Sequence, residues 1–429
     1  MKNKFAIHTL GCKTNQLESF VMVKQLKEAG FEEVDFKECA DFYIINTCSV
    51  TSLVDQESKY YIRKARRTNP EAKVVVTGCF AQVSKDEVSA MPEVDMVLGN
   101  SEKTEILKYL TNQEQRVFVS NIFEEKKFRD ISAHQEKTRA SIKVQDGCNN
   151  FCSYCIIPFA RGRSRSNSLD NILCNIRTLY EDGYKEIVLT GIHLGQWGLD
   201  FEEKKSFLHL LQAIEDTPIE RYRIGSLEPP EISDEVIDFL SSSRKFAHHL
   251  HLSLQSGCDE ILKLMKRHYD VGFYSDIIHK LKMSMPDIFL GSDIIVGFPG
   301  ETEDQFKETY DNLSKLPLSD IHVFPYSARK NTLASKIEPK VADDKKKDRA
   351  DRLKELAHEK KREFLESMRG QTLRVLIERK RDKKTGYLKG ISGNYINVLV
   401  DDERDLCNTM QDVLVENIFD SRAFGRITG

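Results

Sequence analysis

The chain has 429 residues, a length that predicts about three domains. Hydrophobic residues make up 40% of the sequence and charged residues 31%, as is typical of a globular protein. The formal net charge of −3 excludes an overall basic field, so any nucleic-acid binding must depend on local patches.

Two features of the sequence bear on its compartment. No apolar run approaches the roughly 20 residues needed to cross a bilayer, and the N-terminal residues continue directly into a strand pattern. We therefore expect neither a membrane span nor a signal peptide. Ten cysteines without a disulfide framework indicate a reducing cytoplasm and metal binding rather than disulfides.

Residues 1 to about 125 alternate apolar runs of strand length with helical stretches, which predicts a parallel α/β layer. The expected strands are Phe5–Thr9, Phe42–Asn46, Lys73–Thr77 and Val94–Leu98, and the expected helices are Ser19–Ala29 and Ser58–Arg67.

A cysteine follows each of the first three strands: Cys12, Cys48 and Cys79. Ligands bind outside the carboxyl ends of strands in an open parallel sheet, so we expect the three thiols to converge. Gly11 and Gly78 let the backbone turn closely around a bulky ligand. Taken alone, the arrangement favours buried structural thiols. Beside the motif described below, a metal cluster becomes the better interpretation.

From about residue 135 to 330 a strand-then-helix pattern repeats six times, too few for a closed eightfold barrel. The expected strands are Arg139–Gln145, Glu186–Thr190, Tyr222–Ser226, His249–Gln255, Phe289–Val296 and Ile321–Tyr326. The expected helices are Leu169–Asp182, Phe207–Glu215, Glu231–Ser241, Cys258–Lys266, Phe273–Lys282 and Glu303–Leu316.

The most informative motif follows the first of these strands. Cys148, Cys152 and Cys155 place three thiols within eight residues. Three thiolates hold three irons of a [4Fe–4S] cluster and leave the fourth iron open to a small molecule. The alternatives are half of a zinc site or three buried core thiols.

The C-terminal part begins with a charged run, Ala342–Glu366, which reads as one helix. After Gly370 the pattern changes to short strands separated by glycines, and a small five-stranded β-barrel fits it. The expected strands are Thr372–Glu378, Tyr387–Lys389, Tyr395–Val400 and Asp412–Val415.

These motifs resemble a known family. The Cys-x3-Cys-x2-Cys spacing, with Tyr154 before the last cysteine, is similar to the signature of radical S-adenosylmethionine (SAM) enzymes. The sequences around Cys12, Cys48 and Cys79 resemble the N-terminal domain of the methylthiotransferases. The resemblance implies an α/β fold with three domains: 1–125, the methylthiotransferase domain; 134–366, a partial (β/α)6 radical SAM barrel; and 369–429, an OB-like TRAM β-barrel that binds RNA.

The resemblance also implies a transferase reaction. Cys148, Cys152 and Cys155 would hold the radical SAM [4Fe–4S] cluster, and Cys12, Cys48 and Cys79 an auxiliary [4Fe–4S] cluster with its own open iron. One SAM molecule would donate the methyl group, and a second would give the 5′-deoxyadenosyl radical, because the cofactor carries the hard chemistry. Expected partners are a low-potential electron donor such as flavodoxin or ferredoxin, and a sulfur source.

Several polar residues at barrel strand ends are candidates for binding SAM. The side chains of Ser253 and Gln255 alternate with leucines, so they share a polar face that is costly in a barrel interior unless it binds something. The full set that we expect at the cofactor is Tyr154, Thr190, Gly191, Glu228, Ser253, Gln255 and Asp293. Capping is an equally good explanation for Glu228.

The substrate follows from the branch of the family that the chain resembles. The runs around Gly191, Glu228 and Arg163 look most like the branch acting on threonylcarbamoyl-adenosine, just 3′ of a tRNA anticodon. A base in that single-stranded loop enters a pocket without breaking a pair. We expect Arg161, Arg163 or Arg329 to hold the threonyl carboxylate.

Other interpretations remain open from the sequence. Two other branches act on isopentenyl-adenosine in tRNA and on an aspartate of a ribosomal protein. Outside the family, the chain fits a radical enzyme on a small molecule, which the C-terminal barrel disfavours, or a non-catalytic iron–sulfur RNA-binding protein.

Overall fold

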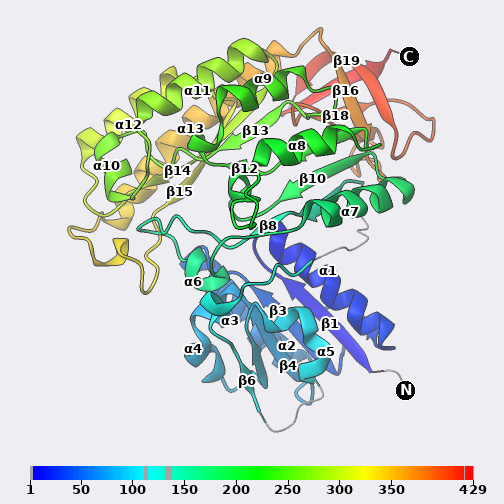
Figure 1. Cartoon of the computed structure of the whole chain (residues 1–429), viewed down its shortest axis with the longest axis vertical. Helices are drawn as coiled ribbons and strands as arrows, with labels where there is room; N and C mark the ends of the chain where they lie inside the picture. The colour runs from blue at the N-terminus through cyan, green and yellow to red at the C-terminus, as the bar shows by residue number, and fades with distance from the viewer. Residues whose placement is uncertain (1–2, 111–114, 131–137, 420, 429) are drawn as a thin grey trace.

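The structure is a computed structural model that describes residues 3–110, 115–130, 138–419 and 421–428. It confirms the expected mixed α/β architecture, with parallel sheets followed by a closed β-barrel (Figure 1). The expected start of the second domain, residue 134, lies outside the described residues. No helix within those described ranges is both long and apolar enough to cross a membrane.

The N-terminal unit is a six-stranded parallel sheet with the strand order β2-β1-β3-β4-β5-β6. Helices cover both faces, and apolar clusters fill each side. The strands are β1 Lys4–Thr9, β2 Glu32–Glu33, β3 Phe42–Thr47, β4 Lys73–Gly78, β5 Met96–Leu98 and β6 Val117–Phe118, and the helices are α1 Lys13–Glu28, α2 Ser52–Thr68, α3 Cys79–Val83, α4 Lys85–Ser89 and α5 Ile106–Leu110. The order reverses between β1 and β3, which is where sheets of this kind bind ligands.

Both long N-terminal helices begin earlier than expected. Helix α1 starts at Lys13 rather than Ser19, and its first turn contains the buried polar residue Asn15. Asn15 Nδ2 donates to the backbone carbonyls of Leu10 and Thr47, at 2.9 Å each. The hydrophobic pattern missed this turn because hydrogen bonds, not apolar contacts, bury it.

The central unit contains six parallel strand positions around one core. Its sheets are β11-β10-β7 and β12-β13-β14-β15, and only Gly225 separates β11 from β12. The strands are β7 Ala140–Lys143, β10 Glu186–Thr190, β11 Arg221–Ile224, β12 Ser226–Leu227, β13 His249–Leu252, β14 Phe289–Val296 and β15 Asp320–Pro325, with β8 Gln145–Asp146 and β9 Arg165–Ser166 pairing antiparallel. The helices are α6 Ile157–Arg161, α7 Leu169–Glu181, α8 Phe207–Glu215, α9 Asp234–Ser242, α10 Asp259–Leu264, α11 Val271–Ser284 and α12 Glu303–Lys315.

Helix α13, Asp343–Ser367, packs along β15 and leads into the C-terminal barrel. The barrel strands are β16 Thr372–Ile377, β17 Leu388–Ser392, β18 Asn397–Val400, β19 Met410–Phe419 and β20 Arg422–Ile427. The sequence analysis did not identify the last strand, β20, which contains Gly425. That glycine is needed because a Cβ there would lie 2.2 Å from the Leu414 carbonyl oxygen.

Two buried arginines attach the C-terminal barrel to the central unit. Arg221 donates to the carbonyls of Arg374 and Ile391, and Arg223 donates to those of Ser392 and Gly393. The fully buried Glu186 carboxylate accepts from both, at 2.5 Å and 3.1 Å. Glu186 therefore offsets the charge of two guanidinium groups that would otherwise be buried without a counterion.

We expect Glu186→Gln to lower the free energy of unfolding by about 3 to 5 kcal/mol, since it leaves two buried cations uncompensated. Glu220→Gln is the matched control, because Glu220 pairs with Arg374 across the same interface at 3.4 Å but is partly exposed. It should cost about 1 kcal/mol or less. Chemical denaturation followed by circular dichroism measures both, and equal costs would contradict this role of Glu186.

Candidate active site between two cysteine sets

The auxiliary set, Cys12, Cys48 and Cys79, lies at the carboxyl ends of β1, β3 and β4. Gly11 has a left-handed φ of +90°, and a Cβ there would lie 2.5 Å from Cys48 Sγ. Burial, and then the nearby Cys79 and Cys12 thiols, raise the pKa of the Cys48 thiol to about 11. The structure therefore brings the three sulfurs of this set together at the switch point of the sheet.

The radical set, Cys148, Cys152 and Cys155, lies in the loop after β8. Cys148 Sγ is 3.5 Å from His193 Nδ1, and Arg267 Nη1 donates to Cys152 Sγ at 3.1 Å. Burial, and then Cys152 and Cys148, raise the pKa of Cys155 to about 12. Thiols that resist ionisation alone lose their protons when a metal binds them, so this donor set fits an iron–sulfur cluster.

A cavity of about 240 Å³ lies beside the radical set, and the segment that follows Cys48 forms part of its wall. Val50 and Thr51, which follow Cys48, form one side, and Tyr154 and Cys155 of the radical loop form another. The remaining lining residues are Ile156, Ile157, Gln255, Asp293, Ile295, Phe324, Pro325, Tyr326 and Ser327. This apolar wall with a few polar groups is typical of a site that holds a small molecule.

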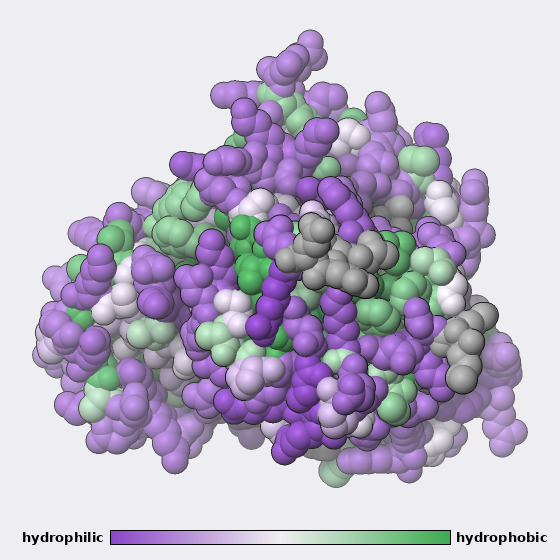
Figure 2. Space-filling view, turned by 90° about the horizontal axis from the view of Figure 1, so that it is seen from below, coloured by the Kyte–Doolittle hydropathy of each residue, from purple (hydrophilic) through white to green (hydrophobic). Residues whose placement is uncertain are grey.

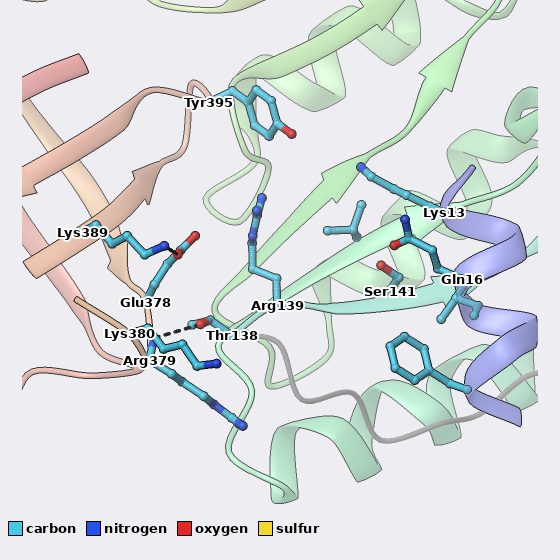
Figure 3. Close-up of a pocket in the computed structure, with 13 residues that line it drawn as sticks. Lys13, Gln16, Thr138, Arg139, Ser141, Glu378, Arg379, Lys380, Lys389 and Tyr395 are labelled. Atoms are coloured by element: carbon cyan, nitrogen blue, oxygen red, sulfur yellow. Dashed lines mark hydrogen bonds and ion pairs between the residues drawn. The ribbon is translucent and has the colours of Figure 1, made fainter. Parts of the chain in front are cut away.

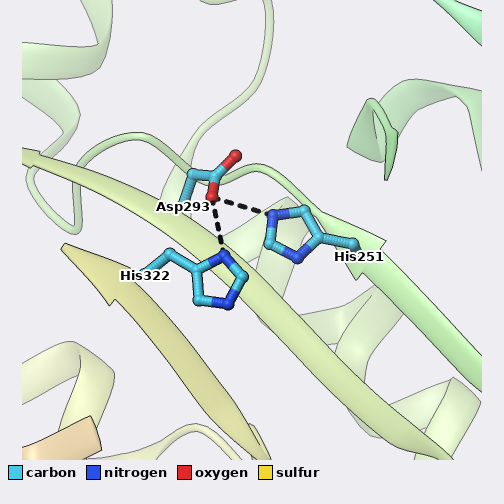
Figure 4. A group of neighbouring side chains, drawn as sticks. All are labelled: His251, Asp293 and His322. Atoms are coloured by element: carbon cyan, nitrogen blue, oxygen red, sulfur yellow. Dashed lines mark ion pairs between the residues drawn. The ribbon is translucent and has the colours of Figure 1, made fainter. Parts of the chain in front are cut away.

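Asp293 lies among polar partners within the barrel (Figure 4). Its Oδ1 atom is 3.0 Å from His251 Nε2 and 3.4 Å from His322 Nδ1, while Ser253 Oγ donates to Oδ2 at 3.2 Å. Burial opposes ionisation of Asp293, but the hydrogen bonds from His251 and His322 outweigh it and hold the pKa well below its usual range. Asp293 therefore presents a stable negative charge beside the cavity.

Gln255 reaches the same cavity from an unusual backbone position. Its φ is +73°, in the left-handed region that side chains other than glycine seldom adopt. The Gln255 N–H donates to the Asp293 carbonyl at 2.8 Å, and its own carbonyl accepts from Ile295 N–H at 2.9 Å. Such strain is typical of functional sites.

Three other residues expected at the cofactor, Thr190, Gly191 and Glu228, do not line this cavity. Thr190 is buried, and its hydroxyl donates to the Ile142 carbonyl at 2.9 Å. Gly191 packs where a Cβ would lie 2.8 Å from Leu194. Glu228 pairs with Arg267 in a second cavity, of about 320 Å³, which His193 also lines.

The three expected substrate arginines have different surroundings. Arg161 is buried and makes two hydrogen bonds to Glu18 of α1, at 2.9 Å and 3.0 Å. Arg329 is also buried, donates to Ser49 Oγ at 2.7 Å and pairs with Asp55 of the N-terminal unit. Only Arg163 of the three is exposed, with its guanidinium 4.9 Å from the Phe151 ring. Arg161 and Arg329 thus hold the two units together.

Glu18, which the sequence did not single out, is the centre of a buried ion-pair network. Besides Arg161, it contacts Lys103 and, at 3.1 Å, Lys143 Nζ of β7. Burial raises the pKa of Glu18, but Arg161, Lys103 and Lys143 more than offset this, so the pKa is well below its usual range. The network joins the N-terminal unit to the barrel beside both cysteine sets.

Asn15 extends this network to the auxiliary cysteines. Arg161 Nη2 donates to Asn15 Oδ1 at 2.7 Å, and Asn15 holds the carbonyls just before Gly11 and Cys48. On the other side, Arg161 Nη1 lies 3.1 Å from Asp146, two residues before Cys148. No sequence spacing identifies this chain of hydrogen bonds from Asn15 through Arg161 to Asp146, because its residues come from separate units.

Comparisons with known proteins identify the class of enzyme. Residues 4–99 match "Uncharacterized protein family UPF0004", and residues 142–313 match "Radical SAM superfamily". The fold is similar to the radical SAM methyltransferase TsrM from Kitasatospora setae, with a TM-score of 0.59, 16% identity and 78% and 77% of the two chains covered. The cysteine loop therefore belongs to a radical SAM barrel, which binds SAM and a [4Fe–4S] cluster.

Similar proteins of known name identify the family within this superfamily. The chain is 43% identical to threonylcarbamoyladenosine tRNA methylthiotransferase MtaB of Bacillus subtilis (strain 168), over 87% of this chain and 84% of that protein. It is 42% identical to the protein of the same name from Aquifex aeolicus (strain VF5), over 87% and 92%. A tRNA-2-methylthio-N(6)-dimethylallyladenosine synthase of Clostridium botulinum (strain Okra / Type B1) is 34% identical, over 87% and 86%. The chain belongs to the radical SAM methylthiotransferase family and is a transferase.

We expect Glu18→Gln to lower the free energy of unfolding by about 3 to 5 kcal/mol, since buried Lys103 loses its counterion and buried Arg161 and Lys143 are left to share Asp146. Glu28→Gln, at the exposed end of the same helix, should change it by less than about 0.5 kcal/mol, because its partner Lys24 is 4.0 Å away on the surface. Denaturation of both variants checks this. A stable Glu18→Gln protein would show that the network does not hold the units together.

Proposed function

We propose that this protein adds a methylthio group to C2 of N6-threonylcarbamoyladenosine, 3′ of the anticodon in tRNA. The observation that carries the proposal is the cavity bounded by Cys155 on one side and by Val50 and Thr51, just after Cys48, on the other. A target base there would be accessible from both cysteine sets. The higher identity to relatives named for threonylcarbamoyladenosine, 43% and 42% against 34%, favours that nucleoside.

We assign three domains to this function: 1–125, 134–366 and 369–429. In this assignment Cys148, Cys152 and Cys155 hold the radical SAM [4Fe–4S] cluster, and Cys12, Cys48 and Cys79 hold an auxiliary one. The donor chemistry supports both, because each set offers three thiols and leaves one iron open. When bound, the clusters supply the electron that cleaves SAM and the sulfur that is transferred, with a first SAM molecule as methyl donor.

In this proposal the side chains around the cavity bind and orient SAM and shield the radical from water. Gln255, Ser253 and Asp293 offer polar contacts to SAM from the strand ends, Glu228 pairs with the Arg267 that contacts Cys152, and Thr190 ends β10. Tyr154 and Tyr326 cover the cavity and exclude water, which protects a radical from side reactions. His193 and Arg267 lie against the sulfurs of Cys148 and Cys152 and offset negative charge there.

The proposed partners are the tRNA anticodon stem–loop, a low-potential electron donor such as flavodoxin or ferredoxin, and a sulfur source. We place the reaction in the cytoplasm, because all ten cysteines are free thiols, which a reducing compartment preserves.

The second candidate is methylthiolation of dimethylallyl-adenosine in tRNA, supported by the relatives at 34% identity. Mass spectrometry of tRNA nucleosides from a strain that lacks the gene distinguishes the two. We expect loss of methylthio-threonylcarbamoyladenosine, restored by the wild-type gene but not by Cys148→Ala, because two thiolates do not hold the site-differentiated cluster. Loss of the dimethylallyl product instead would refute the proposal.

The auxiliary cluster has a separate test. Anaerobically reconstituted protein should contain about eight irons per chain, and the Cys12, Cys48, Cys79 triple alanine variant about four. That variant should still cleave SAM to 5′-deoxyadenosine but should not methylthiolate RNA. Unchanged iron content in the triple variant would mean that these cysteines are structural.

A further inference from the structure

A cleft of about 380 Å³ lies where the three units meet, and it shares no lining residue with the cysteine cavity (Figure 3). Helix α1 contributes Lys13 and Gln16, the segment around the start of β7 contributes Thr138, Arg139 and Ser141, and the C-terminal barrel contributes the rest of the polar wall. The complete lining is Lys13, Gln16, Leu17, Phe20, Thr138, Arg139, Ser141, Val188, Glu378, Arg379, Lys380, Lys389 and Tyr395.

The cleft concentrates positive charge in a protein whose net charge is −3. Five cationic side chains line it against one carboxylate, Glu378, which pairs with Lys389 at 3.0 Å. Arg379 and Lys380 are exposed on the surface of the barrel, and the Arg379 backbone N–H donates to Thr138 Oγ1 at 3.1 Å, which fixes this edge of the barrel against the central unit. Placed cations of this kind attract phosphate groups.

Tyr395 supplies an aromatic ring at the same opening. Its backbone has a φ of +64°, and its N–H donates to the Ser392 carbonyl at 3.2 Å. The same carbonyl accepts from Arg223, so the turn is fixed to the barrel interior. The ring lies 4.9 Å from the Arg223 guanidinium and 6.0 Å from that of Arg139. Figure 3 shows Tyr395, Arg139 and Lys13 pointing toward one opening.

The cleft also leads toward both parts of the candidate active site. Lys13 directly follows Cys12 in the sequence. Tyr395 lines a further cavity of about 140 Å³ together with His251 and His322, the two partners of Asp293. The cleft and this smaller cavity therefore share Tyr395, and the smaller cavity reaches the two histidines that hold Asp293.

We propose that this three-unit cleft binds the single-stranded RNA next to the target nucleotide. Arg379, Lys380 and Lys13 take its phosphates, and Tyr395 stacks on an unpaired base. The inference rests on the proposed function for the identity of the RNA. It adds that the N-terminal unit and the central unit hold the RNA together with the C-terminal barrel. Stacking on a tyrosine and phosphate contacts together recognise a single strand without reading its sequence.

The test measures the affinity of the cluster-loaded enzyme for an anticodon stem–loop RNA carrying the threonylcarbamoyl group, across a salt series. Arg379→Ala/Lys380→Ala should weaken binding at least about tenfold and reduce the log–log salt slope by about 1.4, at about 0.7 per lost single-strand phosphate contact. Arg379→Lys/Lys380→Arg keeps both charges and should keep the wild-type slope. The matched control, Lys383→Ala/Lys384→Ala, removes two exposed charges of the same domain outside the cleft and should change affinity less than about twofold.

Tyr395 is tested by a pair of variants. Tyr395→Leu should weaken binding about 5- to 150-fold, the range for loss of one stacked base, whereas Tyr395→Phe should bind like wild type. Thermal unfolding of every variant separates loss of binding from loss of fold. Equal losses from the cleft pair and the control pair, or equal affinities of the two Tyr395 variants, would overturn the proposal.

Failure of the cleft proposal and failure of the proposed function give different results. If wild-type enzyme yields no methylthio-threonylcarbamoyladenosine but binds RNA with this dependence on the cleft, the reaction assignment fails and the cleft stands. If the product forms and the cleft variants bind normally, only the cleft is wrong, and RNA is held elsewhere.

Discussion

The arrangement of this protein depends on one buried carboxylate, that of Glu18, which lies among Arg161, Lys103 and Lys143. Removing four charges from water is costly, and their mutual attraction offsets that cost only when the geometry is good. A network of this kind tolerates little displacement, because any gap leaves a charge unpaired. The network therefore fixes the position of one cysteine set relative to the other. A continuous apolar interface would fix it less strictly.

The same physical solution recurs at the other junctions. Glu186 lies between Arg221 and Arg223 where the C-terminal barrel attaches, and Asp55 pairs with Arg329 near the cavity. In each case a buried arginine crosses from one unit to another. A reaction between groups held by different units would require such rigidity, since a displacement of about 1 Å in a reacting geometry costs about a hundredfold in rate. On the face seen in Figure 2, hydrophobic residues occur in separate areas among hydrophilic ones.

Much of this could be read from the sequence, for physical reasons that differ between features. The strands β10 and β14 have the bounds expected from the sequence, Glu186–Thr190 and Phe289–Val296, because buried parallel strands are rich in apolar residues. The convergence of Cys12, Cys48 and Cys79 followed from their places after parallel strands. The network around Glu18 could not be found this way, since polar residues buried by long-range pairing have no periodicity. The sequence predicted that Arg161 or Arg329 holds a substrate carboxylate, but both bind carboxylates of the protein itself, those of Glu18 and Asp55. These partners are too distant in the sequence to be found from it.

The bond between Arg161 and Glu18 joins residues 143 positions apart, whereas Asn15 binds the carbonyls of Leu10 and Thr47 within 32 positions. Contacts between distant residues form late, because the chain must first close a long loop. Within the N-terminal unit, Asn15 binds the carbonyls before Gly11 and Cys48, and Lys103 is a counterion of Glu18, so these contacts need no residue of the later units. The ion pair between Glu18 and Arg161 forms only after the chain has been made as far as α6, so the first three strands and the cysteines that follow them precede their partner unit in synthesis.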